Sequence, residues 1–364
     1  MSSAATISPA LLDLTADIDA DWLASVLAPT FPGTAVRAIT RRPIGAGNVS
    51  DTVHIAIDYA VRPDGAPDAV VAKFKPLAPE VHAHGLGSGA YHREIGAYRA
   101  ITERSACRIP RLFHVAGDET NINLVIEDLT ALTPGNQGTG CGVDEAAAVL
   151  TELARLHATF SPLDAATAPA WPIRMADVAD YWAAHAHTGA EQALRRYPGR
   201  LSAADLDTVA AGAELARDWF LLPQSRLTLT HGDPRVDNVL FERAGGGVHA
   251  VLLDWQVTGL RNPMYDVGYF LSGSVPVAQR RAHEHALLDG YLATFAAVCP
   301  GYDRSEATED LRTQIMSGLM ITTAAIAVLP DIDVVNELIL ALLERNCAAV
   351  QDWAALAATR ARVR

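Results

Sequence analysis

Strand-forming and helix-forming stretches are segregated along this chain of 364 residues, and that segregation limits the folds open to it. Alternating, Val- and Ile-rich runs predict strands in the first part, whereas apolar residues at helical spacing dominate the second. A hairpin at 239–241 and 248–253, joined by Gly245-Gly246-Gly247, interrupts the helical part. The sequence therefore predicts an α+β fold, with a small antiparallel β lobe followed by a larger, mainly helical lobe. The expected strands are 36–39, 53–59, 70–74, 111–115 and 123–126, and the expected helices are 19–28, 90–103, 143–160, 203–220, 278–295 and two more between 304 and 360.

The strongest chemical signal lies just before the hairpin, in the run His231-Gly232-Asp233-Pro234-Arg235-Val236-Asp237-Asn238. Phosphoryl transfer to a hydroxyl needs a carboxylate that orients the hydroxyl and accepts its proton, and an oxygen ligand for Mg²⁺ at a fixed distance along the chain. Asp233 and Asn238 have this Asp-x4-Asn spacing. Gly, Asp, Pro and Asn also form ordinary surface turns. The hairpin and the Asp254 that follows it favour the catalytic interpretation, with Asp233 as catalytic residue and Asn238 and Asp254 as metal ligands.

A second signal is Lys73, near the end of the apolar run 70–74. A Lys in this place can bind the α- and β-phosphates of ATP, and a Glu on the next helix would orient it. Glu94 fits that partner. Lys75 is the nearest competitor, but Pro76 follows it, so we prefer Lys73.

Three further segments complete the expected nucleotide site. The glycine-containing run 44–50 lies between two strands, where a flap would cover phosphates; its candidate residues are Gly45, Gly47, Asn48 and Ser50. An ordinary hairpin turn explains this run equally well. The stretch 124–129 ends the β region and is expected to act as a hinge whose backbone pairs with adenine, through Glu127 and Leu129. The run 85–89 lacks dinucleotide-binding spacing and is expected to be a flexible connection.

These signals divide the chain into three parts. Residues 1–35 are expected to form a helical extension and residues 36–129 a nucleotide-binding N-lobe. Residues 130–364 are expected to form a C-lobe with the catalytic loop, the metal ligands and acceptor-binding helices.

Composition excludes several other classes of protein. The net charge is −13 and no basic stripe is present, which argues against nucleic-acid binding. The longest apolar run, 316–329, is broken by polar residues, so no membrane span is predicted. The first residues lack a signal-peptide pattern, and the four cysteines form no CxxC pair. We therefore expect a cytoplasmic protein.

Together these motifs resemble the aminoglycoside phosphotransferase superfamily, whose fold is that of a protein kinase. Asp254-Trp255-Gln256 and the run 265–271 are more similar to its choline/ecdysteroid-kinase-like (CHK-like) branch. The resemblance implies ATP and Mg²⁺ as cofactors and a small-molecule hydroxyl as acceptor. It also implies that His231 and Asp266 support the site, and that Arg235 lies where protein kinases place a Lys near the γ-phosphate. Arg235 is therefore a second candidate catalytic residue, although a surface salt bridge explains it equally well.

Departures from the protein-kinase pattern limit the kinds of molecule that we expect as the phosphate acceptor. Gly232 replaces an Arg, and no Ala-Pro-Glu follows Asp254, so no protein substrate is expected. The stretch 175–187 contains only Asp177 and Asp180 as acids, which favours a neutral or amphipathic acceptor over a polycation. Two alternatives stay open, an aminoglycoside O-phosphotransferase and a catalytically silent nucleotide-binding protein. The candidate acceptor contacts are Tyr181, Trp182, His185 and Trp255.

Overall fold

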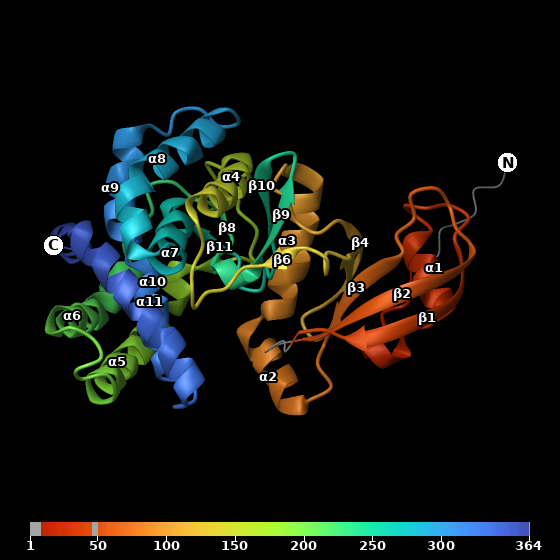
Figure 1. Cartoon of the computed structure of the whole chain (residues 1–364), viewed down its shortest axis with the longest axis horizontal. Helices are drawn as coiled ribbons and strands as arrows, with labels where there is room; N and C mark the ends of the chain where they lie inside the picture. The colour runs from red at the N-terminus through yellow and green to blue at the C-terminus, as the bar shows by residue number, and fades with distance from the viewer. Residues whose placement is uncertain (1–8, 46–49, 364) are drawn as a thin grey trace. The chain divides into compact units, whose positions relative to one another are not determined.

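The structure, a computed structural model, describes residues 9–45 and 50–363, which divide into two compact units (Figure 1). The first unit ends at Ala131, and residues 105–108 belong to the second unit, which continues from Leu132. The fold is the predicted α+β fold, with an antiparallel β unit followed by a mainly helical one.

The first unit is built on a five-stranded antiparallel sheet of order β1-β2-β3-β5-β4. Its strands are β1 (Ala35–Pro43), β2 (Asp51–Val61), β3 (Ala69–Phe74), β4 (Leu112–Gly117) and β5 (Ile122–Glu127). A 3₁₀ turn, η1 (Thr15–Asp17), precedes α1 (Ala20–Leu27), whose N-cap Asp19 accepts a hydrogen bond from the Trp22 N–H. Trp22 and Leu23 share one apolar core with Ile55 and Phe74 of the sheet, so α1 belongs to this unit.

Two helices follow β3, and one of them corrects a prediction. The stretch 85–89, expected to be a flexible connection, is the end of α2 (Pro79–Ser88), and α3 (Ala90–Arg104) begins directly after it. Pro79 occupies the first turn of α2, where a missing N–H costs nothing, and Gly89 ends the helix in the left-handed conformation at φ 68°. A glycine-rich sequence can therefore form a helix when a proline begins it and a left-handed glycine ends it.

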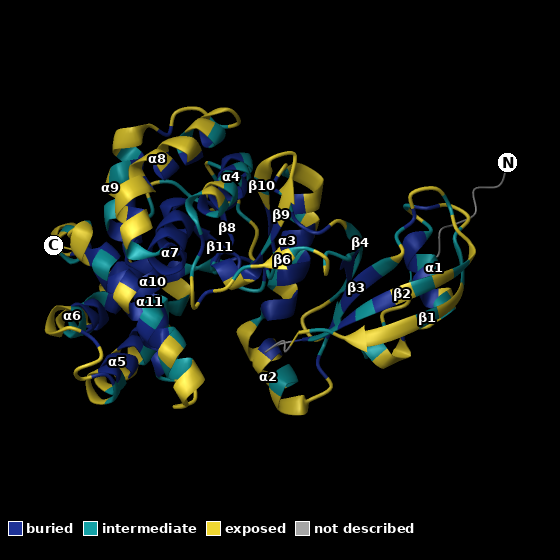
Figure 2. Ribbon diagram, in the orientation of Figure 1, coloured by how far each residue is buried: buried dark blue, intermediate teal, exposed yellow. Residues whose placement is uncertain are grey.

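The second unit contains most of the helices. They are α4 (Val143–Thr159), α5 (Ala179–Arg196), α6 (Ala203–Phe220), α7 (Met264–Ser274), α8 (Val277–Ala296), α9 (Arg304–Gln314), α10 (Ser317–Ile326), α11 (Asp333–Asp352) and α12 (Ala355–Val363). The sequence predicted two helices after residue 304, and the described part of the chain has four. Every residue of α7 is buried, and Figure 2 shows this helix in dark blue among the others. Its first turn carries Asp266, so the acid is fixed from the centre of the unit.

Two small sheets support the loops of this unit. The first has the order β10-β9-β6, from β6 (Thr133–Pro134), β9 (Val239–Ala244) and β10 (Gly247–Leu252). The second has the order β7-β11-β8, from β7 (Ile173–Arg174), β8 (Thr228–Thr230) and β11 (Gly259–Arg261). Short 3₁₀ turns are η2 (Met175–Val178) and η3 (Val236–Asn238). The predicted hairpin is thus β9-β10, and the loop between β8 and β9 carries Asp233.

Within the described ranges, none of the helices is both long and apolar enough to cross a membrane.

Candidate active site

Asp233 and Asn238 contact each other across the loop between β8 and β9. The Asn238 side-chain N–H donates to the Asp233 carbonyl oxygen at 2.9 Å and to Asp233 Oδ2 at 3.2 Å. The second carboxylate oxygen of Asp233, Oδ1, is buried and has no hydrogen-bond partner among the described residues. Buried polar atoms normally have partners, so an orphaned carboxylate oxygen indicates a place where another group binds.

Asp266 fixes the start of this loop from α7. Its carboxylate accepts hydrogen bonds from the backbone N–H groups of His231, at 2.6 Å, and Gly232, at 2.9 Å, and it contacts His157 Nε2 at 3.0 Å. Burial acts to raise the pKa of Asp266, but the hydrogen bond and charge of His157 and the Gly232 N–H hold that pKa below its usual value. Asp266 is therefore an ionised brace, and His157 is a buried structural partner.

Gly232 is required by the packing of the same loop. Its φ is +87°, and a Cβ there would lie 2.2 Å from the Val257 carbonyl oxygen. Any other residue would both clash with backbone and adopt the left-handed conformation that side chains disfavour. The replacement of the protein-kinase Arg by Gly at this position thus has a local steric reason.

The β9-β10 hairpin brings Asp254 beside Asn238. Val239 pairs with Leu252, and the Leu253 N–H donates to the Asn238 carbonyl oxygen at 2.9 Å. β10 ends at Leu252, so Asp254 lies just beyond the strand that was predicted to end in it. Asp254 has a φ of 64°, which is uncommon for a residue other than glycine and typical of functional sites.

His231 connects the catalytic loop to the Asp254 segment. Its Nδ1 accepts from the Asp233 N–H at 3.3 Å, so Nε2 carries the proton and donates to the Leu253 carbonyl oxygen at 2.8 Å. Trp255 packs on the His231 ring with centroids 4.5 Å apart. The imidazole therefore holds Asp233 and the residue before Asp254 in one arrangement.

The donors at this end of the hairpin fit Mg²⁺. Asn238 uses its amide N–H on Asp233, which leaves Oδ1 as a ligand, and Asp254 offers a carboxylate. Throughout the described ranges no three His, Cys, Asp or Glu side chains cluster to hold a metal, so a dedicated protein cage is not found there. Mg²⁺ characteristically uses one or two carboxylate-type ligands together with water and phosphate oxygens.

Arg235 lies beside Asp233 on the same loop. Arg235 Nε is 3.5 Å from Asp233 Oδ2, an ion pair that is too long and poorly aligned for a strong hydrogen bond. The charge of Asp233 is the main reason why the pKa of Arg235 is raised, against a smaller opposing effect of burial. Arg235 thus carries a permanent positive charge next to the candidate base.

Gln137 also fixes the loop, and sequence reasoning missed it. Its Oε1 accepts from the Val236 N–H at 2.9 Å, and its Nε2 donates to the Gly273 carbonyl oxygen at 3.1 Å. Arg345 Nη1 donates to the Gln137 carbonyl oxygen at 2.8 Å, which ties α11 to the same point. The available signal was weak, a single Gln in a glycine-rich loop far from Asp233 in the chain.

In the first unit, the structure brings Lys73 and Glu94 together. Lys73 Nζ on β3 is 2.7 Å from Glu94 Oε1 on α3, and the Glu94 side chain is only 2% exposed. The competitor Lys75 instead pairs with Asp13 Oδ1 at 2.7 Å. The pair that the sequence proposed for the phosphates is thus formed, while Lys75 is engaged by a surface acid.

The other predicted nucleotide residues are placed as follows. Gly45 has a φ of 72°, and Ser50 is buried. Gly47 and Asn48 lie outside the described residues. Glu127 ends β5 and accepts from the Arg111 N–H at 3.0 Å, and Leu129 follows that strand. The roles of these residues toward a nucleotide stay predictions.

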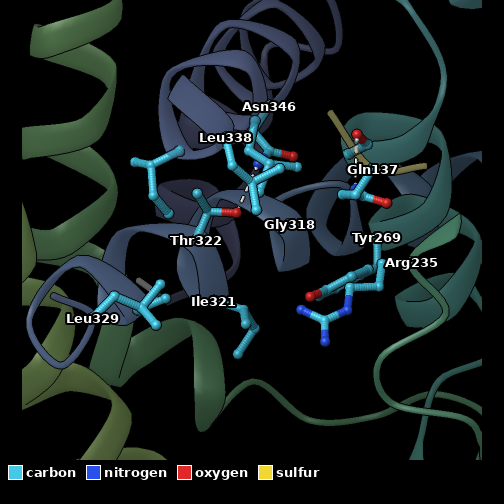
Figure 3. Close-up of a pocket in the computed structure, with 13 residues that line it drawn as sticks. Gln137, Arg235, Tyr269, Gly318, Ile321, Thr322, Leu329, Leu338 and Asn346 are labelled. Carbon is cyan, nitrogen blue, oxygen red and sulfur yellow. Dashed lines mark hydrogen bonds between the residues drawn. The ribbon is translucent and has the colours of Figure 1, made fainter. Parts of the chain in front are cut away.

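The four predicted acceptor contacts do not converge. Tyr181, Trp182 and His185 lie on α5, where Tyr181 is 55% exposed and its ring lies tilted against that of His185, with ring centroids 4.2 Å apart. Trp255 is fully buried behind His231. None of the four lines the pocket that contains Arg235 and Tyr269 (Figure 3).

An Asp–Asn pair beside a second acid at the end of a hairpin, on this α+β fold, is the arrangement expected of a kinase-like phosphotransferase. The chain belongs to the phosphotransferase enzyme family (APH), which matches residues 40–306.

Solved structures to which this chain is similar include the following three. Choline kinase from Cryptosporidium parvum Iowa II is 12% identical, with a TM-score of 0.51 over 88% of this chain and 89% of that chain. A microcompartment-associated aminopropanol kinase is 12% identical, with a TM-score of 0.48 over 93% and 99%. The aminoglycoside phosphotransferase APH(2'')-Ib is 13% identical, with a TM-score of 0.46 over 89% and 97%. No curated protein matches the sequence.

Proposed function

We propose that this protein is an ATP- and Mg²⁺-dependent kinase that transfers the γ-phosphate to a hydroxyl of a small, neutral or amphipathic molecule. The observation that carries the proposal is the buried, unpartnered Oδ1 of Asp233, on a carboxylate whose other oxygen is held by Asn238. Membership of the phosphotransferase enzyme family supports the reaction class. The CHK-like features at 254–256 and 265–271 support a metabolite or natural product as acceptor.

In this mechanism Asp233 Oδ1 accepts the hydrogen bond of the incoming hydroxyl. The hydroxyl oxygen forms a bond to the γ-phosphorus while the bond from that phosphorus to the β,γ-bridging oxygen breaks, and the hydroxyl proton passes to Asp233. Asn238 keeps the carboxylate oriented, and Asp266 and His231 keep the loop fixed around it. Asn238 and Asp254 would hold Mg²⁺, which supplies charge neutralisation on the phosphates. Lys73, oriented by Glu94, would bind the α- and β-phosphates.

Charge removal at Arg235 tests its catalytic role. Since Arg235 carries a positive charge beside Asp233, we expect it to stabilise charge on the transferring phosphoryl group, and Arg235→Gln to lower kcat by about 10²-fold. Arg243→Gln is the matched control, because Arg243 lies on β9 and pairs with Glu145 at the surface. An unchanged kcat in Arg235→Gln would leave Arg235 as a surface ion pair only.

Replacing Lys73 tests the phosphate-binding pair. We expect Lys73→Ala to raise the KM for ATP by about 10- to 100-fold, the loss of one charge-assisted interaction. Glu94→Ala should raise it less, because Glu94 only positions Lys73. Lys75→Ala is the control and should match the wild type, since Lys75 pairs with Asp13. Steady-state kinetics at varied ATP measure all three. A silent Lys73→Ala with a damaging Lys75→Ala would move the site to Lys75.

The proposed function is tested by ATP consumption across a library of hydroxylated metabolites and antibiotics. Thermal shifts with ATP and Mg²⁺ first establish nucleotide binding, and ADP release with a matched acceptor then establishes transfer. Nucleotide binding without transfer to any acceptor would favour a catalytically silent protein. A kcat/KM that is insensitive to salt supports a neutral acceptor, whereas efficient, steeply salt-dependent phosphorylation of polycations would establish the aminoglycoside alternative.

A further inference from the structure

A pocket in the second unit lies between α10 and α11. Six of its lining residues are apolar, and all six lie on these two helices or at the segment that joins them (Figure 3): Ile321, Ala325, Leu329, Leu338, Ile339 and Leu342. No Asp or Glu lines it. A pocket with such a wall removes apolar surface of a ligand from water and offers no carboxylate to a cation.

Several polar groups in the pocket wall already bond within the protein. Asn346 Nδ2 donates to Thr322 Oγ1 at 3.0 Å, and the Gln137 side chain bonds to Gly273 and Val236. Asn346 Oδ1 faces α10, since a Cβ on Gly318 would lie 2.3 Å from it. Gln137 and Asn346 Nδ2 therefore have little hydrogen-bonding capacity left for a ligand, whereas Asn346 Oδ1 is buried and has no hydrogen-bond partner among the described residues.

The same pocket reaches the candidate base. Arg235 and Tyr269 both line it, and Arg235 pairs with Asp233. Burial raises the pKa of Tyr269 well above its usual value, and the charge of the nearby Asp233 raises it further. A ligand between α10 and α11 would thus have one end next to Arg235 and Tyr269, on the side of Asp233.

Two acids that neighbour pocket-lining residues in the sequence form ion pairs with arginines. Glu337 pairs with Arg200 at 2.9 Å, and Asp331 lies 3.3 Å from Arg196. The apolar wall, by contrast, continues outward, because Val334 is one helical turn before Leu338 on α11 and is 73% exposed. The start of α11 and the segment before it therefore carry exposed apolar surface beside acids that are paired.

We propose that the acceptor is an uncharged alcohol with an apolar body, which packs between α10 and α11 and presents its hydroxyl toward Asp233. This rests on the proposed kinase function and deepens it, since amino alcohols and polyamines would bring an ammonium group into a wall without a carboxylate. The residues that select the acceptor are then those of α10 and α11 rather than the aromatic residues of α5.

A chain-length series tests the proposal directly. Binding of 1-butanol to 1-octanol, measured by ligand-observed NMR in the presence of ADP and Mg²⁺, should tighten by about fourfold for each added methylene that is buried. The matched probe 6-amino-1-hexanol has the length of 1-hexanol plus a terminal ammonium, and should bind more weakly than 1-hexanol. Equal or tighter binding of the amino alcohol, or affinity that is flat with chain length, would overturn the proposal.

Single substitutions test whether the dependence of binding on chain length arises in this pocket. Ala325→Leu adds volume inside the pocket and should abolish the gain with chain length, whereas Ala327→Leu adds the same volume just past the end of α10 and should not. Leu338→Asn makes the wall polar while keeping the branched shape of the side chain, and should lower the affinity for 1-hexanol even if Ala325→Leu folds poorly. If all three variants bind the series as the wild type does, the pocket assignment is wrong.

The series also separates this proposal from the proposed function. Chain-length-dependent binding that Ala325→Leu removes, but with no ADP formed from ATP and any alcohol, would refute the kinase and leave the apolar pocket standing. ADP formation with polar or cationic acceptors, and a flat alcohol series, would support the kinase and refute the apolar acceptor.

Discussion

Asp233→Asn is expected to abolish phosphoryl transfer while the protein still binds ATP. The amide keeps the shape of the side chain but cannot take the hydroxyl proton, so kcat should fall by about 10²- to 10⁴-fold or more, the range for loss of a general base. Nucleotide affinity should stay nearly unchanged, because Asp233 acts on the incoming hydroxyl. Single-turnover kinetics and a nucleotide titration on the same preparation measure both quantities.

The outcome is informative only if the variant folds like the wild type. Asp233 pairs with Arg235 and accepts from Asn238, and neither contact holds the core, so the melting temperature should change little. Asp233→Ala removes the side chain altogether and should lose activity to at least the same extent. Turnover in either variant that is comparable to the wild type would remove the catalytic assignment.

Local sequence is sufficient to bring together the candidate catalytic residues of the second unit. Asp233 and Asn238 are five positions apart and Asp254 follows one hairpin, so chain geometry alone places them at one end of β9 and β10. The Lys73–Glu94 pair is formed for a similar reason, because one strand and the next long helix carry the two residues. Short-range order along the chain thus carries most of the information about the proposed chemistry.

Contacts between segments far apart in sequence were not predictable in this way. Gln137 reaches Val236, and Arg345 reaches Gln137, only after the helices of the second unit have packed. Sequence periodicity indicates which face of a single helix or strand is buried. It does not predict these pairs, because the two residues of each pair lie on different elements.

The proposed acceptor pocket was also beyond the reach of local sequence. The sequence drew attention to aromatic residues such as Tyr181 and Trp255, since large side chains dominate many binding sites. The structure exposes Tyr181 on α5 and buries Trp255 behind His231, and it places aliphatic residues of α10 and α11 around the pocket. Aliphatic residues at helical spacing are mostly core, so only the packed structure distinguishes a pocket wall from a core face.

Asp254→Asn is expected to lower Mg²⁺-supported activity by at least about 10²-fold, and by more than Asn238→Ala does, because Asp254 contributes a full negative charge to the metal. Asn is the better replacement at this position, since it tolerates the left-handed backbone at φ 64° and Ala does not. The Asp254→Asn protein should therefore fold normally, and a defect can be attributed to the lost charge.

The measurement is activity as a function of Mg²⁺ concentration at fixed ATP. Asp254→Asn should need a higher Mg²⁺ concentration for half-maximal activity, Asn238→Ala should show a smaller shift in the same direction, and Glu242→Gln should behave like the wild type. Glu242 is the matched control because it is an exposed acid on β9 of the same hairpin. It lies nearer the end of the strand that is away from Asn238. Metal-independent activity in the wild type, or an unchanged Mg²⁺ requirement in both ligand variants, would refute the assignment. A graded loss in the order Asp254, Asn238, Glu242 follows only if ligand charge at the end of the hairpin sets metal affinity.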